Sequence, residues 1–289
     1  MKWSYSESKI FSKCQRKWYY FSIMANPSSK DPLRKEAYLL KQLQTVYAWR
    51  GALVDSVIQR QIIPKMRHHK LPSEDQVLEF ATQLINKQIS FGIEKKYRDY
   101  NVTKSSTDDA YCAFYELEYD KGLDEEKLER AKEDIISSLK NLLHSNILKE
   151  IAVSNLHVIA QRELTFQFDR DIDVSCTPDM IVFFKDKPPL IVDWKVHSYS
   201  SADAWLQLGI YAIALIRVKP HKDFPSNLTQ IGNPSNVQLI EYQLLKNIQR
   251  EYRLSAEDIA DIEDYIFQSS IQIKKVVNGR KYDKSFISK

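Results

Sequence analysis

The pattern of hydrophobic and polar positions divides the chain into a helical first half and a strand-rich second half. Up to about residue 150, apolar residues recur at the spacing of one helix face; beyond it they run together or alternate, as in strands. Two stretches of turn-forming and small polar residues, 26–32 and 103–109, interrupt the helical half. The expected helices are 6–22 with Ser6 as cap, 33–63 ending at Pro64, 73–91, 124–148, 201–218 and one opening at 255; the expected strands are 156–168, 180–184, 190–195 and 237–245.

This order of elements predicts an α/β fold. Strands that follow one another and then alternate with helices are typical of a sheet covered by helices, and the helical first half reads as an insertion. We expect a single domain over residues 1–289. Within it, residues 33–150 form a helical lobe and residues 151–250 form the sheet core.

The most informative segment is a predicted hairpin with charged residues at one end. Asp179 opens the strand 180–184, a polar turn follows, and the strand that begins at Leu190 reaches Asp193 and Lys195. Side chains alternate along a strand, so residues 193 and 195 share a face. Two carboxylates and an ammonium group should therefore converge, as a divalent metal and a phosphodiester require.

The spelling Pro178-Asp179 and Asp193-Trp194-Lys195 resembles the PD-(D/E)xK nuclease superfamily. The helix expected after the lysine carries Gln207 and Tyr211 in a Q-x-x-x-Y pattern, which resembles the RecB-like branch with its RecB and AddB nuclease domains and CRISPR-associated exonucleases. The resemblance implies a restriction-endonuclease-like core, in which helices flank a central mixed β-sheet.

The resemblance also implies roles for these residues. Asp179 and Asp193 would bind Mg²⁺ or Mn²⁺ with the backbone carbonyl of Trp194, and Lys195 would lie beside the attacking water and the scissile phosphate. Gln207 and Tyr211 lie one helical turn apart and would either contact the DNA backbone or buttress the site. Catalytic and metal-binding residues would then come from one hairpin and the helix after it.

Two further acids have a functional and a structural interpretation. Residues 51–55 approximate a family segment that ends in a metal-binding histidine, and here Asp55 stands in its place. A carboxylate suits Mg²⁺ well, so Asp55 is either a further ligand or a solvated helix charge. Glu163, in the strand expected before the hairpin, either supports the metal from outside its ligand shell or faces solvent.

An iron–sulfur cluster is not expected. Cys14 and its neighbours approximate the first ligand segment of the cluster-containing relatives, but the chain has no cysteine after Cys176 to complete four thiolate ligands. Nearby, Arg16 and Tyr20 are candidate phosphate contacts. Lys96 and Arg98 stand among tyrosines, which suits single-stranded nucleic acid or simply a solvated helix end.

Composition narrows the class of protein. The formal charge of +4 is only mildly basic, so a nucleic-acid surface would be local. Three scattered cysteines suit a reducing compartment, no apolar run approaches the length of a membrane span, and the first residues do not resemble a signal peptide. We therefore expect a cytoplasmic protein.

These observations favour a Mg²⁺- or Mn²⁺-dependent deoxyribonuclease that works as an exonuclease or on ends and single strands. The alternative is a nucleic-acid-binding or scaffold subunit that keeps the fold with weak or no turnover. RNA is a third candidate substrate, because phosphate geometry is shared. The chain has no helicase motor, so a helicase would be a separate partner. DNA repair, mobile-element processing and phage defence are all compatible settings.

Overall fold

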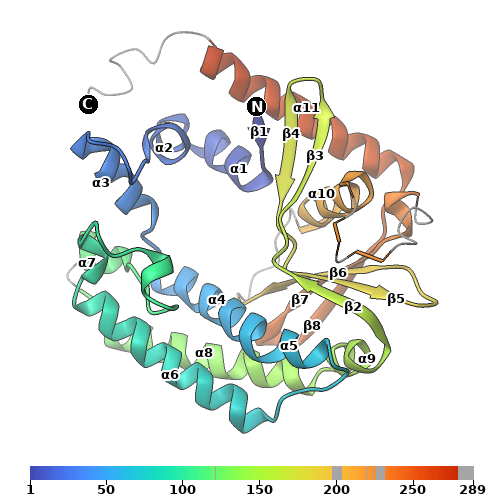
Figure 1. Ribbon diagram of the computed structural model, residues 1–289, viewed down its shortest axis with the longest axis horizontal. Helices are drawn as coiled ribbons and strands as arrows, with labels where there is room; N and C mark the ends of the chain where they lie inside the picture. Colours follow the sequence, from blue (N-terminus) through green and yellow to red (C-terminus); the bar gives the residue numbers. More distant parts are fainter. Residues whose placement is uncertain (121, 197–203, 220, 223, 226–231, 279–289) are drawn as a thin grey trace.

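The strands form two sheets, a three-stranded one and a five-stranded one (Figure 1). The computed structural model describes residues 1–120, 122–196, 204–219, 221–222, 224–225 and 232–278. The small sheet has the order β1-β4-β3 and the large sheet the order β2-β5-β6-β7-β8. The strands are β1 (Lys2–Trp3), β2 (Asn155–Ala160), β3 (Leu164–Asp169), β4 (Ile172–Cys176), β5 (Met180–Phe184), β6 (Leu190–Lys195), β7 (Gln238–Gln243) and β8 (Ile248–Tyr252).

Helices surround the large sheet, which is mixed because β6 and β7 are parallel and its other pairs antiparallel. The expected α/β class is therefore confirmed. The helices are α1 (Tyr5–Lys13), α2 (Gln15–Trp18), α3 (Pro32–Lys41), α4 (Val46–Val57), α5 (Ile63–Met66), α6 (Glu74–Ile93), α7 (Tyr115–Tyr119), α8 (Glu125–His144), α9 (Asn146–Ser154), α10 (Ala204–Arg217) and α11 (Ala256–Asn278). Shorter turns are the π-helical η1 (Tyr19–Met24) and η2 (Ile58–Ile62) and the 3₁₀ turns η3 (Lys96–Arg98), η4 (Lys104–Ser106), η6 (Pro234–Asn236) and η7 (Leu244–Lys246).

Each face of the large sheet packs into its own hydrophobic core. Val192 and Trp194 of β6 join the core formed with α4, α6 and α8 of the helical lobe. Ile191, from the same strand, joins the core formed with α10, α11 and the small sheet. This division follows from the alternation of side chains along a strand, and Figure 1 shows α4 and α10 on opposite sides of the sheet.

Several boundaries differ from those expected. Ser4, not Ser6, caps the first helix, and the backbone is extended at Cys14, which separates α1 from α2. The expected helix 33–63 breaks between Lys41 and Val46. It then continues past Pro64, because the proline lies in the first turn of α5, directly after a π-helical turn, where its missing N–H is tolerated.

The expected strand 156–168 is two strands in different sheets. β2 pairs with β5, whereas β3 pairs with β4, and Gln161 between them has a left-handed backbone with φ of 51°. The alternation 156–168 hides this change of sheet because both halves keep the period of two. β4 and β8 were not expected from the sequence. The helix expected at 201–218 is observed as α10 from residue 204, and residues 201–203 lie outside the described part.

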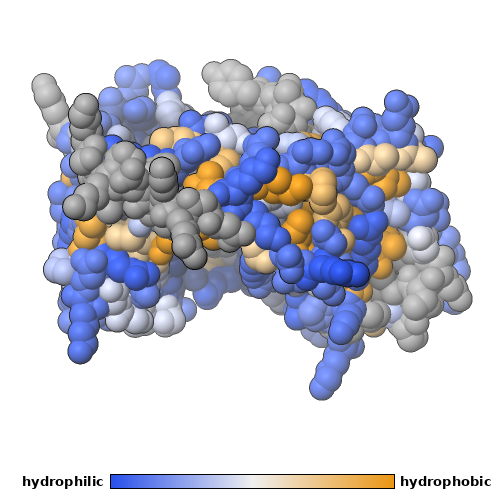
Figure 2. Space-filling model, turned by 90° about the horizontal axis from the view of Figure 1, so that it is seen from above, coloured by the Kyte–Doolittle hydropathy of each residue, from blue (hydrophilic) through white to orange (hydrophobic). Residues whose placement is uncertain are grey.

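Polar side chains cover much of the face shown in Figure 2, and apolar atoms appear between them. Within the described residues, no helix is long and apolar enough to cross a membrane.

Candidate active site

The β5–β6 hairpin brings Asp179 and Asp193 opposite each other. Met180 pairs with Val192, so the next position outward on each strand is one of the two acids. Both oxygens of Asp179 are held: the Trp194 backbone N–H donates to Oδ2 at 3.0 Å, and Gln161 Nε2 donates to Oδ1 at 3.0 Å. The Asp179 side chain thus accepts a hydrogen bond from a backbone N–H of β6 just beyond the last residue pair of β5 and β6.

Asp193 and Lys195 lie on the same face of β6, toward α10. The Lys195 ammonium is 2.6 Å from Asp193 Oδ2, although it is not aligned as a hydrogen-bond donor to that oxygen, so the contact is an ion pair. On the other oxygen, Gln207 Nε2 lies 3.4 Å from Oδ1, and the same nitrogen is 2.5 Å from the Tyr211 hydroxyl. The structure therefore brings together Asp193, Lys195, Gln207 and Tyr211.

Burial is the largest influence on the pKa of each acid of the pair. Burial raises the pKa of Asp179 well above its usual range, and the charges of Asp193 and Asp55 raise it further. Burial also raises the pKa of Asp193, against the lowering effect of the Lys195 charge. Burial opposes the charge on Lys195, but the carboxylates outweigh it and raise its pKa. Lys195 is therefore an ammonium ion at neutral pH.

Asp55 reaches this cluster from the helical lobe. It lies on α4, and the Trp194 indole donates from Nε1 to Asp55 Oδ1 at 2.8 Å. Burial raises its pKa to about 6, partly offset by the Trp194 hydrogen bond and the Lys195 charge. Asp55 is thus a partly buried acid that accepts a hydrogen bond from Trp194 and whose pKa is shifted by the charges of the β6 residues.

The donor set fits a hard cation. Burial raises the pKa values of Asp179 and Asp193, so a nearby cation would favour their charged forms, and Asp193 Oδ2 is a buried oxygen without an aligned donor. The Trp194 carbonyl faces the same edge of β6 as its N–H, toward Asp179. Among the described residues no three His, Cys, Asp or Glu side chains form a ready-made metal cluster, so the acids meet as a pair with Asp55 beside them.

A comparison with protein-family models matches residues 2–283 to the PD-(D/E)XK nuclease superfamily. The chain belongs to this superfamily. A search of curated proteins found no match. The expected superfamily is confirmed, and with it a nuclease fold that acts on nucleic acid; the role of each residue stays a prediction.

A groove of about 460 Å³ extends from Gln207 and Tyr211 of the candidate active site to the N-terminal helix. Its wall includes Ser4, Glu7, Glu163, Ser175, Gln207 and Tyr211. Glu163 precedes β3, which corrects its expected place inside a strand; it pairs with Lys2, accepts a hydrogen bond from Ser175 and leaves 55% of its side chain exposed. Glu163 is therefore part of the groove wall.

The candidate nucleic-acid contacts lie outside the acid cluster. Arg98 binds both Glu36 and Glu118, and Lys96 lies 2.7 Å from Glu94, so both cations already have carboxylate partners. Arg16 lies on α2 and Tyr20 on η1, in the basic N-terminal segment. A phosphate contact by Arg98 would require breaking its ion pairs.

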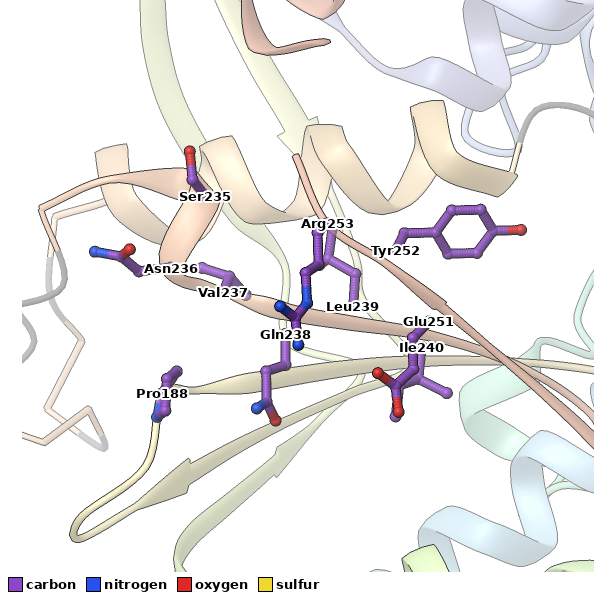
Figure 3. Close-up of a pocket in the computed structure, with 10 residues that line it drawn as sticks. All are labelled: Pro188, Ser235, Asn236, Val237, Gln238, Leu239, Ile240, Glu251, Tyr252 and Arg253. Carbon is purple, nitrogen blue, oxygen red and sulfur yellow. The ribbon is translucent and has the colours of Figure 1, made fainter. Parts of the chain in front are cut away.

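A second cavity lies at the opposite end of the sheet (Figure 3). It measures about 320 Å³ and is lined by Pro188, Gln238 and Arg253, among others. Gln238 pairs with Leu190 at the start of β6, whereas the site residues lie at the end of that strand. This cavity therefore does not belong to the candidate active site.

Sequence reasoning missed Gln161 and Glu241. Gln161 orients Asp179, and Glu241 pairs in register with Asp193 on the neighbouring strand, fully buried, with Tyr252 and Arg250 at its Oε2. The charge of Glu241 raises the pKa of Asp193. The sequence did contain a signal for Glu241, because it interrupts the run Leu239, Ile240 and Tyr242 within an expected strand, and acids are rarely buried without a partner. Gln161 had no such signal.

Proposed function

We propose that this protein is a metal-dependent deoxyribonuclease of RecB-like type. It would hydrolyse phosphodiester bonds as an exonuclease or at ends and single strands. The observation that carries the proposal is the acid pair of Asp193, which is buried, and Asp179, which is partly buried, with the Lys195 ammonium 2.6 Å from Asp193. Two acids that burial shifts toward the neutral form are costly for a fold and useful for binding a hard cation.

Asp179, Asp193 and the Trp194 carbonyl would hold Mg²⁺ or Mn²⁺, with Asp55 as a further ligand in place of the family's histidine. The bound ion supplies charge neutralisation and an activated water. Lys195, which is protonated, cannot accept a proton from that water; it donates hydrogen bonds to the phosphate and stabilises the negative charge that develops there. Attack by water would form a bond from its oxygen to phosphorus and break the bond from phosphorus to the leaving oxygen; the attacking water would lose a proton to solvent, and the leaving oxygen would take one up from solvent.

Gln207 and Tyr211 would orient Asp193 and border the path of the substrate. Gln207 contacts Asp193 and the Tyr211 hydroxyl, and both residues line the groove that runs toward α1. A strand in this groove would pass directly beside the acid pair. This arrangement supports a role for the Q-x-x-x-Y helix in buttressing the site and in contacting the DNA.

A cleavage panel tests the proposal. End-labelled single strands, duplexes, end-blocked circles and RNA are incubated with Mg²⁺ or Mn²⁺, and the products are resolved on a denaturing gel. Lys195→Met should lose cleavage, whereas the matched control Lys187→Met should keep it, because Lys187 pairs with Glu150 beside the hairpin turn. Tight DNA binding by the wild type with no product under any condition would favour the scaffold alternative.

We propose further that the nuclease works in the cytoplasm, in DNA repair or phage defence, with a separate helicase or another protein partner. The three cysteines are free thiols, and Cys112 and Cys176 are buried, which supports a reducing compartment. A pull-down with the Lys195→Met protein, which should hold its substrate complex, would identify such a partner.

A further inference from the structure

Positive charge is concentrated in the N-terminal helices. Residues 1–41 contain nine Lys and Arg and three Asp and Glu, a formal charge of +6, whereas the whole chain carries +4. The remaining residues are therefore slightly acidic. A polyanion approaching this protein is attracted mainly to α1, α2, η1 and α3, which lie together at one side of the molecule (Figure 1).

These helices enclose a small pocket with an apolar floor, called here the aromatic pocket. It measures about 220 Å³ and lies between α2–η1 on one side and α3 on the other. Its walls combine aromatic, aliphatic and cationic side chains: Lys17, Tyr20, Phe21, Leu33, Leu40 and Lys41. Leu33 is 46% exposed, so apolar surface remains open to solvent at the mouth.

The cations at the mouth are available to a ligand. Lys17 and Lys41 are exposed, and neither takes part in an ion pair with any residue that the structure describes. The Lys41 ammonium lies 4.2 Å from the centroid of the Phe21 ring. The acid of the lining, Glu36, is bound to Arg98 at 3.0 Å and so is already neutralised. The pocket thus offers positive charge around an apolar interior.

The aromatic pocket and the groove of the nuclease site are bordered by residues of the same N-terminal segment. Trp18, two residues before Tyr20, donates from its indole to Glu7 at 2.8 Å, and Glu7 lines the groove that ends at Gln207 and Tyr211. One short stretch of backbone therefore borders both features. A chain of nucleotides that leaves the acid pair along the groove would meet the basic helices next.

We propose that the aromatic pocket binds one unpaired nucleobase of a single strand, with the flanking phosphates on Lys17 and Lys41. The proposal rests on the proposed function in taking nucleic acid as the ligand, and it adds the substrate class: a strand that is single at this distance from the site. A base in a duplex cannot leave its partner to enter a pocket without unpairing. Stacking on aromatic rings beside cations is the chemistry by which proteins hold single strands.

The test uses Phe21→Leu, which keeps an apolar side chain but removes the ring. Its matched control is Tyr47→Leu, because Tyr47 is also an exposed ring with cations over it, Arg50 and Lys127, but it lies in the helical lobe. Binding of a fluorescent oligothymidylate is measured in EDTA. Since stacking on one base contributes about 1–3 kcal/mol, Phe21→Leu should weaken binding at least about fivefold. Tyr47→Leu should bind as the wild type does, and blunt duplex binding should not change.

A second measurement locates the base. Oligonucleotides carry 2-aminopurine at successive positions, and its fluorescence falls on stacking. The wild type should quench one position or two adjacent ones; Phe21→Leu should lose this quenching, and Lys41→Gln should weaken binding with a smaller salt dependence. Equal affinity and quenching in wild type and Phe21→Leu would overturn the proposal, as would equal losses in Phe21→Leu and Tyr47→Leu.

The outcome is separable from that of the proposed function. A wild type that quenches 2-aminopurine through Phe21 but never cleaves would retain the subsite and refute the nuclease activity. A wild type that cleaves, beside a Phe21→Leu variant that binds, quenches and cleaves equally well, would refute the subsite alone. Circular dichroism melts of each variant report whether a loss reflects unfolding.

Discussion

The indole of Trp194 donates a hydrogen bond to Asp55 at 2.8 Å and thereby joins the sheet to the helical lobe. Trp194 is the middle residue between Asp193 and Lys195, so its side chain points to the opposite face of β6 from theirs. It is 4% exposed and packs in the core shared with α4. One residue therefore presents its backbone to Asp179 and its side chain to Asp55.

Replacing Trp194 by phenylalanine should weaken metal binding. The ring still fills the core, but Asp55 loses the donor that fixes its orientation, and loss of such a supporting bond typically costs about tenfold or more in metal affinity. Mn²⁺ titration by calorimetry measures this. The matched control is Trp49→Phe. Trp49 lies on α4, the helix of Asp55, and its buried indole donates a hydrogen bond of 2.7 Å to Gln88, outside the candidate site. Equal Mn²⁺ affinity in both variants and the wild type would contradict the role of Trp194.

Asp179→Asn should stabilise the metal-free protein by about 1 kcal/mol while removing its response to metal. The asparagine relieves repulsion with Asp193 and Asp55, keeps an acceptor for the Trp194 N–H and lets the Gln161 amide turn to match it. Thermal melts in EDTA and in Mn²⁺ measure both effects. Asp171→Asn, at an exposed ion pair with Lys274, serves as the control and should still be stabilised by Mn²⁺. An Asp179→Asn protein that Mn²⁺ stabilises like wild type would exclude Asp179 as a ligand.

The pH dependence of stability should carry the signature of Asp55. Its pKa is raised to about 6 in the folded protein, so the native state binds its proton more tightly than the unfolded chain does. The stabilisation is complete below about pH 4 and is lost as the pH rises through 6, a change of at most roughly 3 kcal/mol. Urea unfolding in EDTA between pH 4 and 7 should show a flatter curve for Asp55→Asn than for wild type. Parallel curves would argue against a raised pKa.

Metal affinity should change in the opposite direction, rising with pH, because a cation needs the ionised carboxylate.

Two glycines in helices should respond to alanine in opposite ways. At Gly51 on α4 a methyl group would meet no atom within 4 Å, so Gly51→Ala should stabilise by about 1 kcal/mol through helix propensity. At Gly209 on α10 it would lie 2.3 Å from Ile262 Cδ1 of α11, so Gly209→Ala should destabilise by about 1–3 kcal/mol. Urea unfolding compares the two variants, and a stabilising Gly209→Ala would show that the contact between α10 and α11 is looser than described.

Local sequence patterns predicted the β5–β6 hairpin, but they failed where consecutive strands pair in different sheets. Strands β5 and β6 follow from apolar runs around a polar turn, and alternation alone places Asp193 and Lys195 on one face. The split of 156–168 between two sheets left no trace, because the period of two is the same in both. The partner of Asp55 was equally hidden: Trp194 lies 139 positions away, and no local rule connects a helix residue with a strand residue at that distance.

The alternation along β6 makes the geometry of the candidate active site dependent on the packing on both faces of the sheet. Its odd-numbered side chains pack toward α10 and its even-numbered ones toward the helical lobe. Looser packing on either face would therefore displace a side chain of the candidate site. A fragment that contains only the hairpin would retain the signature residues yet lack the surroundings that bury them. The proposed cleavage activity should thus report on the integrity of the entire fold, and substitutions far from the acids should lower it in proportion to the packing they disturb.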